Sequence, residues 1–213
     1  MITYIPYQKI DKIKYDYCIA HSKDARIYAY SWYLDCVTDH WDLMMEGDYE
    51  LVMPLPRKTK YGITYIFTPP WIQQLGLFSL NEISEKTQQE LYKRLSKKFH
   101  WIDYHFNAGY QGTIGSLQIK RNYLLSLKED FKKIQDQYNK NRRRISRKSF
   151  DDLFLDKQGE LKVFIENYKN QHKPYPISEA SIDCLECICR ANNVHVHIWN
   201  VFYNKEFMAG LLW

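Results

Sequence analysis

The residues with the clearest capacity for chemistry form a cationic run near the middle of the chain, YNKNRRRISRK, from Tyr138 to Lys148. The run holds six basic residues and no acid. At helical spacing five of them form one continuous stripe, which consists of Lys140, Arg143, Arg144, Arg147 and Lys148. Such a stripe can contact phosphates. The alternative is a solvated helix end, where cations favour the negative pole of the helix dipole.

Arg142 differs from its neighbours because it lies in register with Tyr138 and Ile145, beside the apolar side of the same helix. A guanidinium that is partly buried there needs a carboxylate, a phosphate or backbone carbonyls as a partner. We therefore predict that Arg142 binds an anion.

A second segment with chemical potential is PPWIQQLGLFS, from Pro69 to Ser79. Two prolines fix its start, and Gly76 permits an unusual backbone conformation. Gln73 and Gln74 lie between apolar residues, and their amides suit a groove that orients a peptide or an acyl-amide ligand. The alternative is a structural loop whose glutamines satisfy buried backbone groups.

Aromatic residues gather between Tyr28 and Met44, where Trp32, Tyr33 and Trp41 could line a pocket. A core helix packed by aromatic rings is the favoured interpretation of this segment. Four residues are nevertheless predicted to bind ligand or substrate, and they are Trp32, Tyr65, Gln73 and Gln74.

Histidines and cysteines near the C-terminus do not predict a metal site. His195 and His197 alternate along a strand without a third ligand nearby, which favours the polar face of a sheet. Cys184, Cys187 and Cys189 form a single C-x-x-C-x-C knuckle, whereas zinc sites usually pair two. We expect these cysteines to pack in the interior.

The composition limits the classes of protein to which the chain can belong. The chain has 213 residues, enough for one large domain or two small ones, and 16% of them are aromatic, which excludes a disordered chain. The net charge of +5 is by itself too small to indicate nucleic-acid binding, but it fits a phosphate-bearing ligand. The five cysteines, with no signal peptide and no membrane-length apolar run, predict a cytoplasmic protein with reduced thiols. No G-x-S-x-G, P-loop or H-E-x-x-H motif is present.

Periodicity predicts a mixture of strands and helices. Strands are expected at 2–10 (with a turn), 49–55, 63–68, 100–106, 118–125, 194–202 and 206–213, with turns at RKTKYG and at Asn204. Pro54 and Pro56 are expected to end the second of these strands. Helices are expected at 11–38 with a break near 21–25, at 79–99, and from Ser126 through Ile145, then around 161–168 and from about 178. This order predicts an α+β class with a largely antiparallel sheet and flanking helices.

Four segments together resemble Fem-like and related GNAT-type acyltransferases. They are SWYLD (Ser31–Asp35), VMPLP (Val52–Pro56), PPWIQQLGLFS and YNKNRRRISRK. The resemblance implies a GNAT-like acyl-CoA N-acyltransferase fold in two halves, with residues 1–125 as the first half and 126–213 as a linking basic helix and the start of the second. In this family a helix with an asparagine and paired basic residues commonly precedes the second half. The donor- or anion-binding residues implied here are Asn139, Lys140, Arg142 and Arg143.

The resemblance also implies a reaction: transfer of an acyl or aminoacyl group from acyl-CoA or aminoacyl-tRNA to a small-molecule or peptide amine. Such a protein supplies no covalent nucleophile and instead positions the amine and stabilises the oxyanion through backbone N–H groups. The catalytic base is not identified, although Asp103, Tyr104 and His105 are candidates.

One departure from the family concerns the cofactor. In GNAT folds a glycine-rich turn and a helix follow a strand, and the helix N-terminus binds the pyrophosphate of the cofactor. This chain reaches Trp213 on the strand FMAGLLW, so we expect an incomplete second half, no pyrophosphate loop and an open sheet edge that favours a homodimer. Gly109, Gly112 and Gly115 are not accepted as a substitute, because they lie between strands. The alternative function is a non-catalytic ligand- or protein-binding module on a degenerate GNAT fold.

Overall fold

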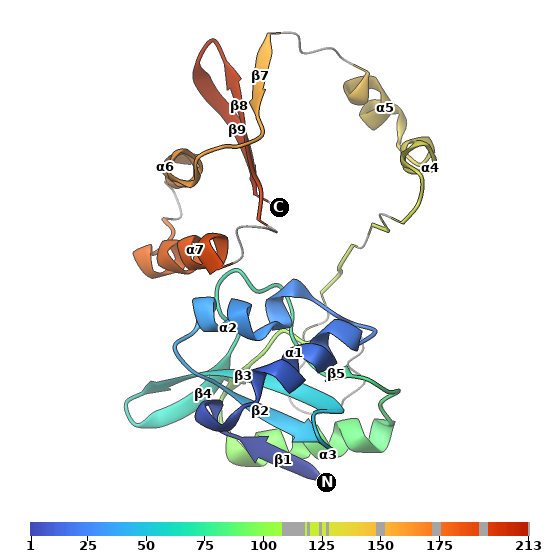
Figure 1. Ribbon diagram of the computed structural model, residues 1–213, viewed down its shortest axis with the longest axis vertical. Helices are drawn as coiled ribbons and strands as arrows, with labels where there is room; N and C mark the ends of the chain where they lie inside the picture. Colours follow the sequence, from blue (N-terminus) through green and yellow to red (C-terminus); the bar gives the residue numbers. More distant parts are fainter. Residues whose placement is uncertain are drawn as a thin grey trace.

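The computed structural model describes residues 1–107, 118, 120–123, 125–126, 128–147, 152–171, 176–191 and 196–212. An N-terminal lobe spans residues 1–107 and a C-terminal lobe spans residues 152–212 (Figure 1). The segment 118–147, called the connecting arm below, arches between them and stands apart from both sheets. The chain is of the α+β class, and its sheets are largely antiparallel.

The N-terminal lobe contains a mixed sheet in the order β1-β2-β3-β4-β6, with β5 also paired to β3. Its strands are β1 (Ile2–Ile5), β2 (Trp41–Glu46), β3 (Leu51–Lys60), β4 (Ile63–Phe67), β5 (Phe78–Ser79) and β6 (Ile102–Asp103). The pairing of β4 with β6 is parallel, and the other strand pairs are antiparallel. α1 and α2 lie on one face of this sheet and α3 on the other (Figure 1). The helices are η1 (Tyr7–Lys9), α1 (Lys12–His21), η2 (Ile27–Ala29), α2 (Ser31–Val37) and α3 (Glu85–Lys98).

Two of these helices begin where side chains satisfy their free N–H groups. Asp11 accepts hydrogen bonds from the backbone N–H groups of Ile13 and Lys14, and so starts α1. Ser84 accepts from the N–H of Thr87 and starts α3, six residues after the position predicted from the sequence, because β5 occupies residues 78–79. The predicted helical region 11–38 is confirmed, including its break after residue 21.

Strand β2 is absent from the sequence prediction. Its first four residues, from Trp41 to Met44, are all buried, so both faces of the strand are covered. A strand buried on both faces has no alternation of polar and apolar residues, and that alternation is the signal from which a strand is recognised.

The expectation that Pro54 and Pro56 end a strand is wrong, because β3 runs through both to Lys60. The N–H of Arg57 donates to the carbonyl of His40, on the β2 side of β3, at 3.0 Å. Backbone directions alternate along a strand, so the nitrogens of both prolines point away from β2. On that other side the carbonyl of Pro54 accepts from the hydroxyl of Tyr104 at 2.7 Å, and no ladder hydrogen bond of the β2–β3 pair is lost.

The C-terminal lobe consists of a three-stranded antiparallel sheet, in the order β7-β8-β9, and two helices. Its elements are β7 (Leu153–Asp156), α6 (Leu161–Gln171), α7 (Glu179–Ala191), β8 (Ile198–Tyr203) and β9 (Glu206–Leu212). Both helices and the final hairpin confirm the sequence prediction, and Asn204 takes the predicted turn position with φ +48°. Residues 194–195 of the predicted strand lie outside the described residues.

The connecting arm does not form the predicted single helix. Asp130 starts α4 (Phe131–Asp136), and Asn139 starts α5 (Lys140–Ser146) by accepting a hydrogen bond from the N–H of Arg142 at 2.9 Å. The cap at Asn139 divides the single helix that the sequence predicts. The cap at Asp130 lies four residues beyond the predicted start at Ser126. The strand expected at 118–125 is not formed by the described residues of that range.

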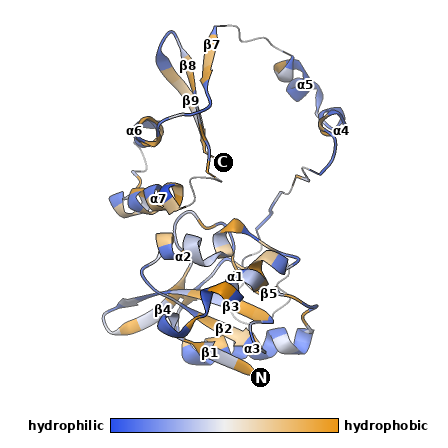
Figure 2. Ribbon diagram, viewed as in Figure 1, coloured by the Kyte–Doolittle hydropathy of each residue, from blue (hydrophilic) through white to orange (hydrophobic). Residues whose placement is uncertain are grey.

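The lobes share a packed junction. The core of the N-terminal lobe includes Ile188 of α7, and α7 packs on α2. A smaller cluster of Ile165, Ile182 and Leu185 lies between α6 and α7, and Trp71 contacts both clusters. Figure 2 shows apolar residues in the strands of both sheets and largely polar residues along α4 and α5.

Candidate functional site

Positive charge is concentrated in the connecting arm. Residues 118–147 contain ten Lys and Arg and three Asp and Glu, a net charge of +7, whereas the whole chain carries +5. The two lobes and the remaining segments together are therefore slightly acidic. All ten basic side chains are exposed. A concentrated and solvated positive surface attracts polyanions.

The cations of the arm have few acidic partners. Within the part of the arm that the structure describes, the one ion pair joins Lys133 to Glu129 at 3.3 Å. Arg143 donates to the backbone carbonyl of Asp136 at 2.7 Å, and Arg144 donates to the side-chain oxygen of Asn141 at 3.2 Å. Both contacts orient a guanidinium without neutralising it. Lys148, a member of the predicted stripe, lies outside the described residues.

Arg142 is exposed, so the expectation of a partly buried guanidinium beside an apolar stripe is wrong. The cause is the division of the helix: α5 begins at Lys140, and Tyr138 therefore lies outside it. The guanidinium of Arg142 lies over the ring of Tyr138, 5.8 Å from its centroid. The structure thus brings three predicted residues, Asn139, Lys140 and Arg142, together at one exposed helix start.

Exposed aromatic rings accompany these cations. Tyr123 is 84% exposed and Phe131 is 65% exposed, and the ring of Tyr138 is half-buried beneath Arg142. Exposed rings within a basic segment can stack on unpaired bases, and its cations can contact phosphates.

The PPWIQQLGLFS segment lies at the junction of the lobes rather than on the arm. Trp71 has φ +64°, and its carbonyl accepts a hydrogen bond from the hydroxyl of Tyr33 at 2.7 Å. Its indole N–H donates to the carbonyl of Ser181 on α7 at 2.5 Å, and its ring contacts that of Tyr168 on α6. Trp71 therefore ties α2 of one lobe to both helices of the other.

Gln73 and Gln74 occupy different environments. Gln73 is exposed, and its amide donates to Asn122 of the arm at 3.4 Å, whereas Gln74 is 7% exposed. Gly76 has φ +146°, and a Cβ atom there would lie 2.4 Å from Oδ1 of Asn107. Asn107 in turn donates to the carbonyl of Leu77 at 3.0 Å. The glycine of this segment is thus required by close packing.

The remaining predicted ligand residues are spread over the N-terminal lobe. Trp32 is half-buried on α2, and Tyr65 is half-buried on β4, with its ring edge against Phe67.

The three candidate bases differ in accessibility. Asp103 and His105 are exposed. The Tyr104 hydroxyl is buried, and burial raises its pKa well above the usual value, so Tyr104 does not serve as a base near neutral pH.

Sequence reasoning missed a buried acid on β2. The carboxylate of Asp42 accepts from the N–H of Tyr7 at 2.9 Å and also from the Tyr4 hydroxyl and the Arg57 guanidinium. Burial, with the hydrogen bond to Asp42, raises the pKa of Tyr4. These three partners belong to β1, η1 and β3, so Asp42 joins these elements. The sequence did contain a signal for this group, which is one acidic residue, Asp42, between the apolar residues Trp41 and Leu43.

The cysteines do not all pack as free thiols. Cys36 of α2 and Cys187 of α7 form a disulfide, with their Cα atoms 5.3 Å apart, so the expectation of reduced packing cysteines is wrong for this pair. Cys18, Cys184 and Cys189 are free. Burial raises the pKa of Cys18 and of Cys189 to about 11, which leaves both thiols protonated near neutral pH.

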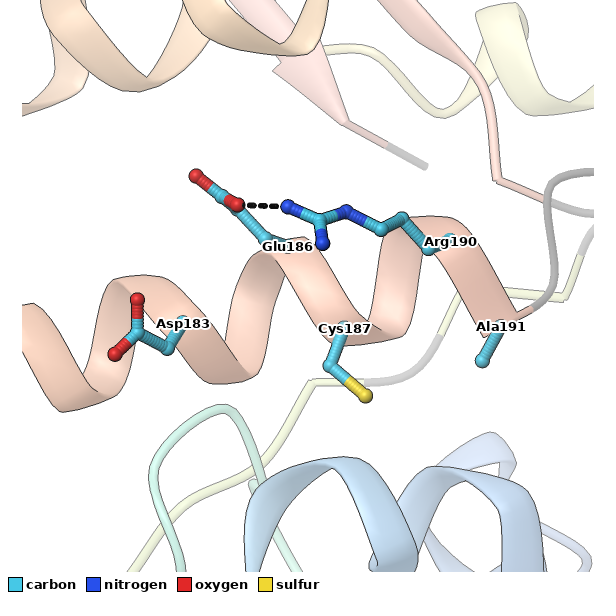
Figure 3. Close-up of a pocket in the computed structure, with 5 residues that line it drawn as sticks. All are labelled: Asp183, Glu186, Cys187, Arg190 and Ala191. Atoms are coloured by element: carbon cyan, nitrogen blue, oxygen red, sulfur yellow. Dashed lines mark hydrogen bonds and ion pairs between the residues drawn. The ribbon is translucent and has the colours of Figure 1, made fainter.

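Two cavities adjoin α7. The first, of about 470 Å³, is lined by Asp183, Glu186, Cys187, Arg190 and Ala191. Figure 3 shows Cys187 on the side of α7 that faces the N-terminal lobe, whereas the Glu186–Arg190 ion pair projects from the opposite side.

The second cavity, of about 430 Å³, lies between the start of α6, the end of α7 and the start of β8. Among the described residues no three His, Cys, Asp or Glu side chains gather as a metal site. His197 is exposed, and its predicted companion His195 lies outside the described residues.

Comparison of the chain with models of protein families, with curated proteins and with solved structures found no match in any of the three. Within the described part of the chain, no helix combines the length and the apolar character that crossing a membrane requires.

Proposed function

We propose that this chain is a GNAT-related, Fem-like transferase that moves an aminoacyl group from an RNA carrier to an amine, with the connecting arm as its RNA-binding surface. The observation that carries the proposal is the net charge of +7 on the arm, with exposed aromatic rings among its cations.

The architecture supports a protein built from two related halves. The N-terminal lobe begins with a strand, two α-helices and two more strands, as β1-α1-α2-β2-β3, and the C-terminal lobe repeats that order as β7-α6-α7-β8-β9. In both lobes the three strands are antiparallel neighbours in the same sequence order. The family that the sequence resembles pairs two halves, and this repeat is the structural feature that agrees with it.

The starts of α1 and α3 do not fit the pyrophosphate of acyl-CoA. The carboxylate of Asp11 already accepts from the free N–H groups at the start of α1. Ser84 caps α3, and Glu85 places a negative charge in its first turn. Both arrangements oppose the binding of a second anion.

The start of α6 does not fit it either. The N–H of Gly159, in the turn before this helix, donates to the carbonyl of Ile198 at 2.9 Å. The space beside the Gly159 Cα is filled by the side chain of Asn200, whose Nδ2 would lie 2.5 Å from an added Cβ. One N–H of this turn and the space beside its glycine are thus already occupied by β8. Gly109, Gly112 and Gly115 lie outside the described residues.

A direct transfer agrees with the state of the free thiols. Burial raises the pKa of all three free thiols, Cys18, Cys184 and Cys189, which disfavours the thiolate that a covalent intermediate requires. In a direct transfer the protein positions donor and amine, and its contribution comes from orientation and from dipoles aimed at the oxyanion.

The salt dependence of tRNA binding tests the proposal. Binding of a labelled tRNA mixture to the full chain should weaken steeply with salt, and the triple variant Arg143→Ala, Arg144→Ala and Arg147→Ala should reduce the slope of log K against log salt by about 2, since each lost phosphate contact removes about 0.7. The matched control removes three exposed lysines from α3, on the far side of the N-terminal lobe, as Lys86→Ala, Lys93→Ala and Lys97→Ala. Equal slopes for wild type and the arginine variant would refute the assignment of the arm.

A further inference from the structure

A covalent bond joins the two lobes at the place where they pack. Cys36 lies on α2 of the N-terminal lobe and Cys187 on α7 of the C-terminal lobe, 151 positions apart in the sequence. The same two helices form the main helix–helix contact between the lobes. Besides the disulfide, the junction rests on the Trp71–Ser181 hydrogen bond and on apolar contacts such as those of Ile188.

The bond is open to small reagents. Both cysteines are partly exposed, and Cys187 lines the cavity of about 470 Å³ beside α7. Accessible disulfides exchange with thiols in solution, whereas enclosed disulfides resist exchange. The cavity therefore gives a low-molecular-weight thiol a path to the Cys187 sulfur.

The other cysteines compete poorly for this bond. Exchange requires a thiolate, and burial raises the pKa of each of the three free thiols, Cys18, Cys184 and Cys189. The pairing of Cys36 with Cys187 is thereby kept against internal reshuffling.

We propose that Cys36 and Cys187 form a reversible thiol–disulfide clamp that holds the C-terminal lobe docked on the N-terminal lobe. In the oxidised chain α7 is fixed on α2. In the reduced chain docking depends on non-covalent contacts such as those of Trp71 and Ile188, and α7 separates from α2 more often. The clamp is independent of the RNA donor, because it rests on residues outside the connecting arm.

The chemistry balances with a disulfide such as glutathione disulfide as the oxidant. One cysteine thiolate attacks the oxidant, breaks its S–S bond and releases one glutathione. The second cysteine thiolate then attacks the mixed disulfide, forms the Cys36–Cys187 bond and releases the second glutathione. The two protons lost by the cysteines are taken up by the two glutathione thiolates, and two electrons pass from the protein to the oxidant.

Hydrogen exchange of the full chain, followed by mass spectrometry at defined ratios of glutathione to glutathione disulfide, tests the clamp. Reduction should speed exchange of the α7 amides (Glu179–Ala191) by about tenfold or more, because docking loses its covalent constraint. The amides of α3 (Glu85–Lys98), on the opposite side of the N-terminal lobe, should keep their protection.

Single variants provide the controls. Cys36→Ser and Cys187→Ser should show the reduced pattern without any reductant, and Cys184→Ser should behave as wild type in both states. Equal protection of α7 in oxidised and reduced wild type would overturn the proposal. So would loss of protection in α3 on reduction, since the bond would then stabilise the whole chain, and so would a linked peptide that contains Cys184 in place of Cys187.

Discussion

Replacement of Gly76 by alanine should cost far more stability than replacement of another glycine that also has a positive φ. Gly76 has φ +146°, a conformation that residues with a Cβ rarely adopt. An added Cβ would also lie 2.4 Å from Oδ1 and 2.7 Å from Cγ of Asn107. Asn107 is 4% exposed and holds the carbonyl of Leu77, so it cannot move without breaking a buried hydrogen bond.

The expected loss of stability for Gly76→Ala is the sum of a backbone cost and a packing cost. The backbone conformation costs about 1–3 kcal/mol. Displacement of Asn107 leaves a buried carbonyl unsatisfied and costs about 1–3 kcal/mol more. The free energy of unfolding should therefore fall by about 4 kcal/mol.

Gly62 provides the matched control, because it has φ +77° and no atom within 4 Å of an added Cβ. Gly62→Ala should cost only about 1 kcal/mol from the backbone term. Urea unfolding of both variants measures the difference, and Asn107→Ala in the Gly76→Ala background should recover part of the loss. If Gly76→Ala costs no more than Gly62→Ala, the packing of this segment has been misassigned.

Three further predictions concern stability. Cys36→Ser should lower the free energy that opens the C-terminal lobe of the oxidised chain by up to about 5 kcal/mol, the upper limit given by the chain-entropy value for a loop of 151 residues, and hydrogen exchange of α7 without reductant that gives equal values for variant and wild type would contradict this. Trp71→Phe removes the donor to the Ser181 carbonyl and should cost about 1 kcal/mol, whereas an unchanged urea midpoint would argue against that hydrogen bond. The raised pKa of Cys18 and of Cys189, about 11 against an ordinary value of 9.0, contributes stability that is fully present below pH 9 and is lost as the pH rises toward 11. The urea midpoint of the reduced chain should thus fall between pH 8 and pH 10.5, and a rise would refute the assigned burial.

The sequence was sufficient for elements whose pattern is local. The apolar stripes of α6 and α7 and the turn at Asn204 follow from neighbouring residues alone, and the structure confirms them. The sequence did not predict strand β2, because both of its faces are buried. It predicted that β3 ends at Pro54–Pro56, because the direction in which Pro54 faces depends on the neighbouring strand. Both errors arise where tertiary contacts override local preference.

The candidate site likewise contains features that local sequence predicts and features that depend on tertiary contacts. The concentration of cations in the connecting arm is a property of the sequence, and it was predicted in part through Arg143 and Lys140. The exposure of Arg142 and the pairing of Cys36 with Cys187 were not predicted. The first depends on where α5 begins, and the second joins residues that are 151 positions apart.

The most direct test of the proposed function compares two donors on the full chain by calorimetry. The arm predicts that a tRNA mixture binds at low salt and is released as salt rises, because its exposed cations replace counterions on the phosphates. The starts of α1 and α3, which Asp11 and Ser84 cap, predict no heat with acetyl-CoA at millimolar concentration. Binding of acetyl-CoA together with no salt-dependent binding of tRNA would contradict the proposal.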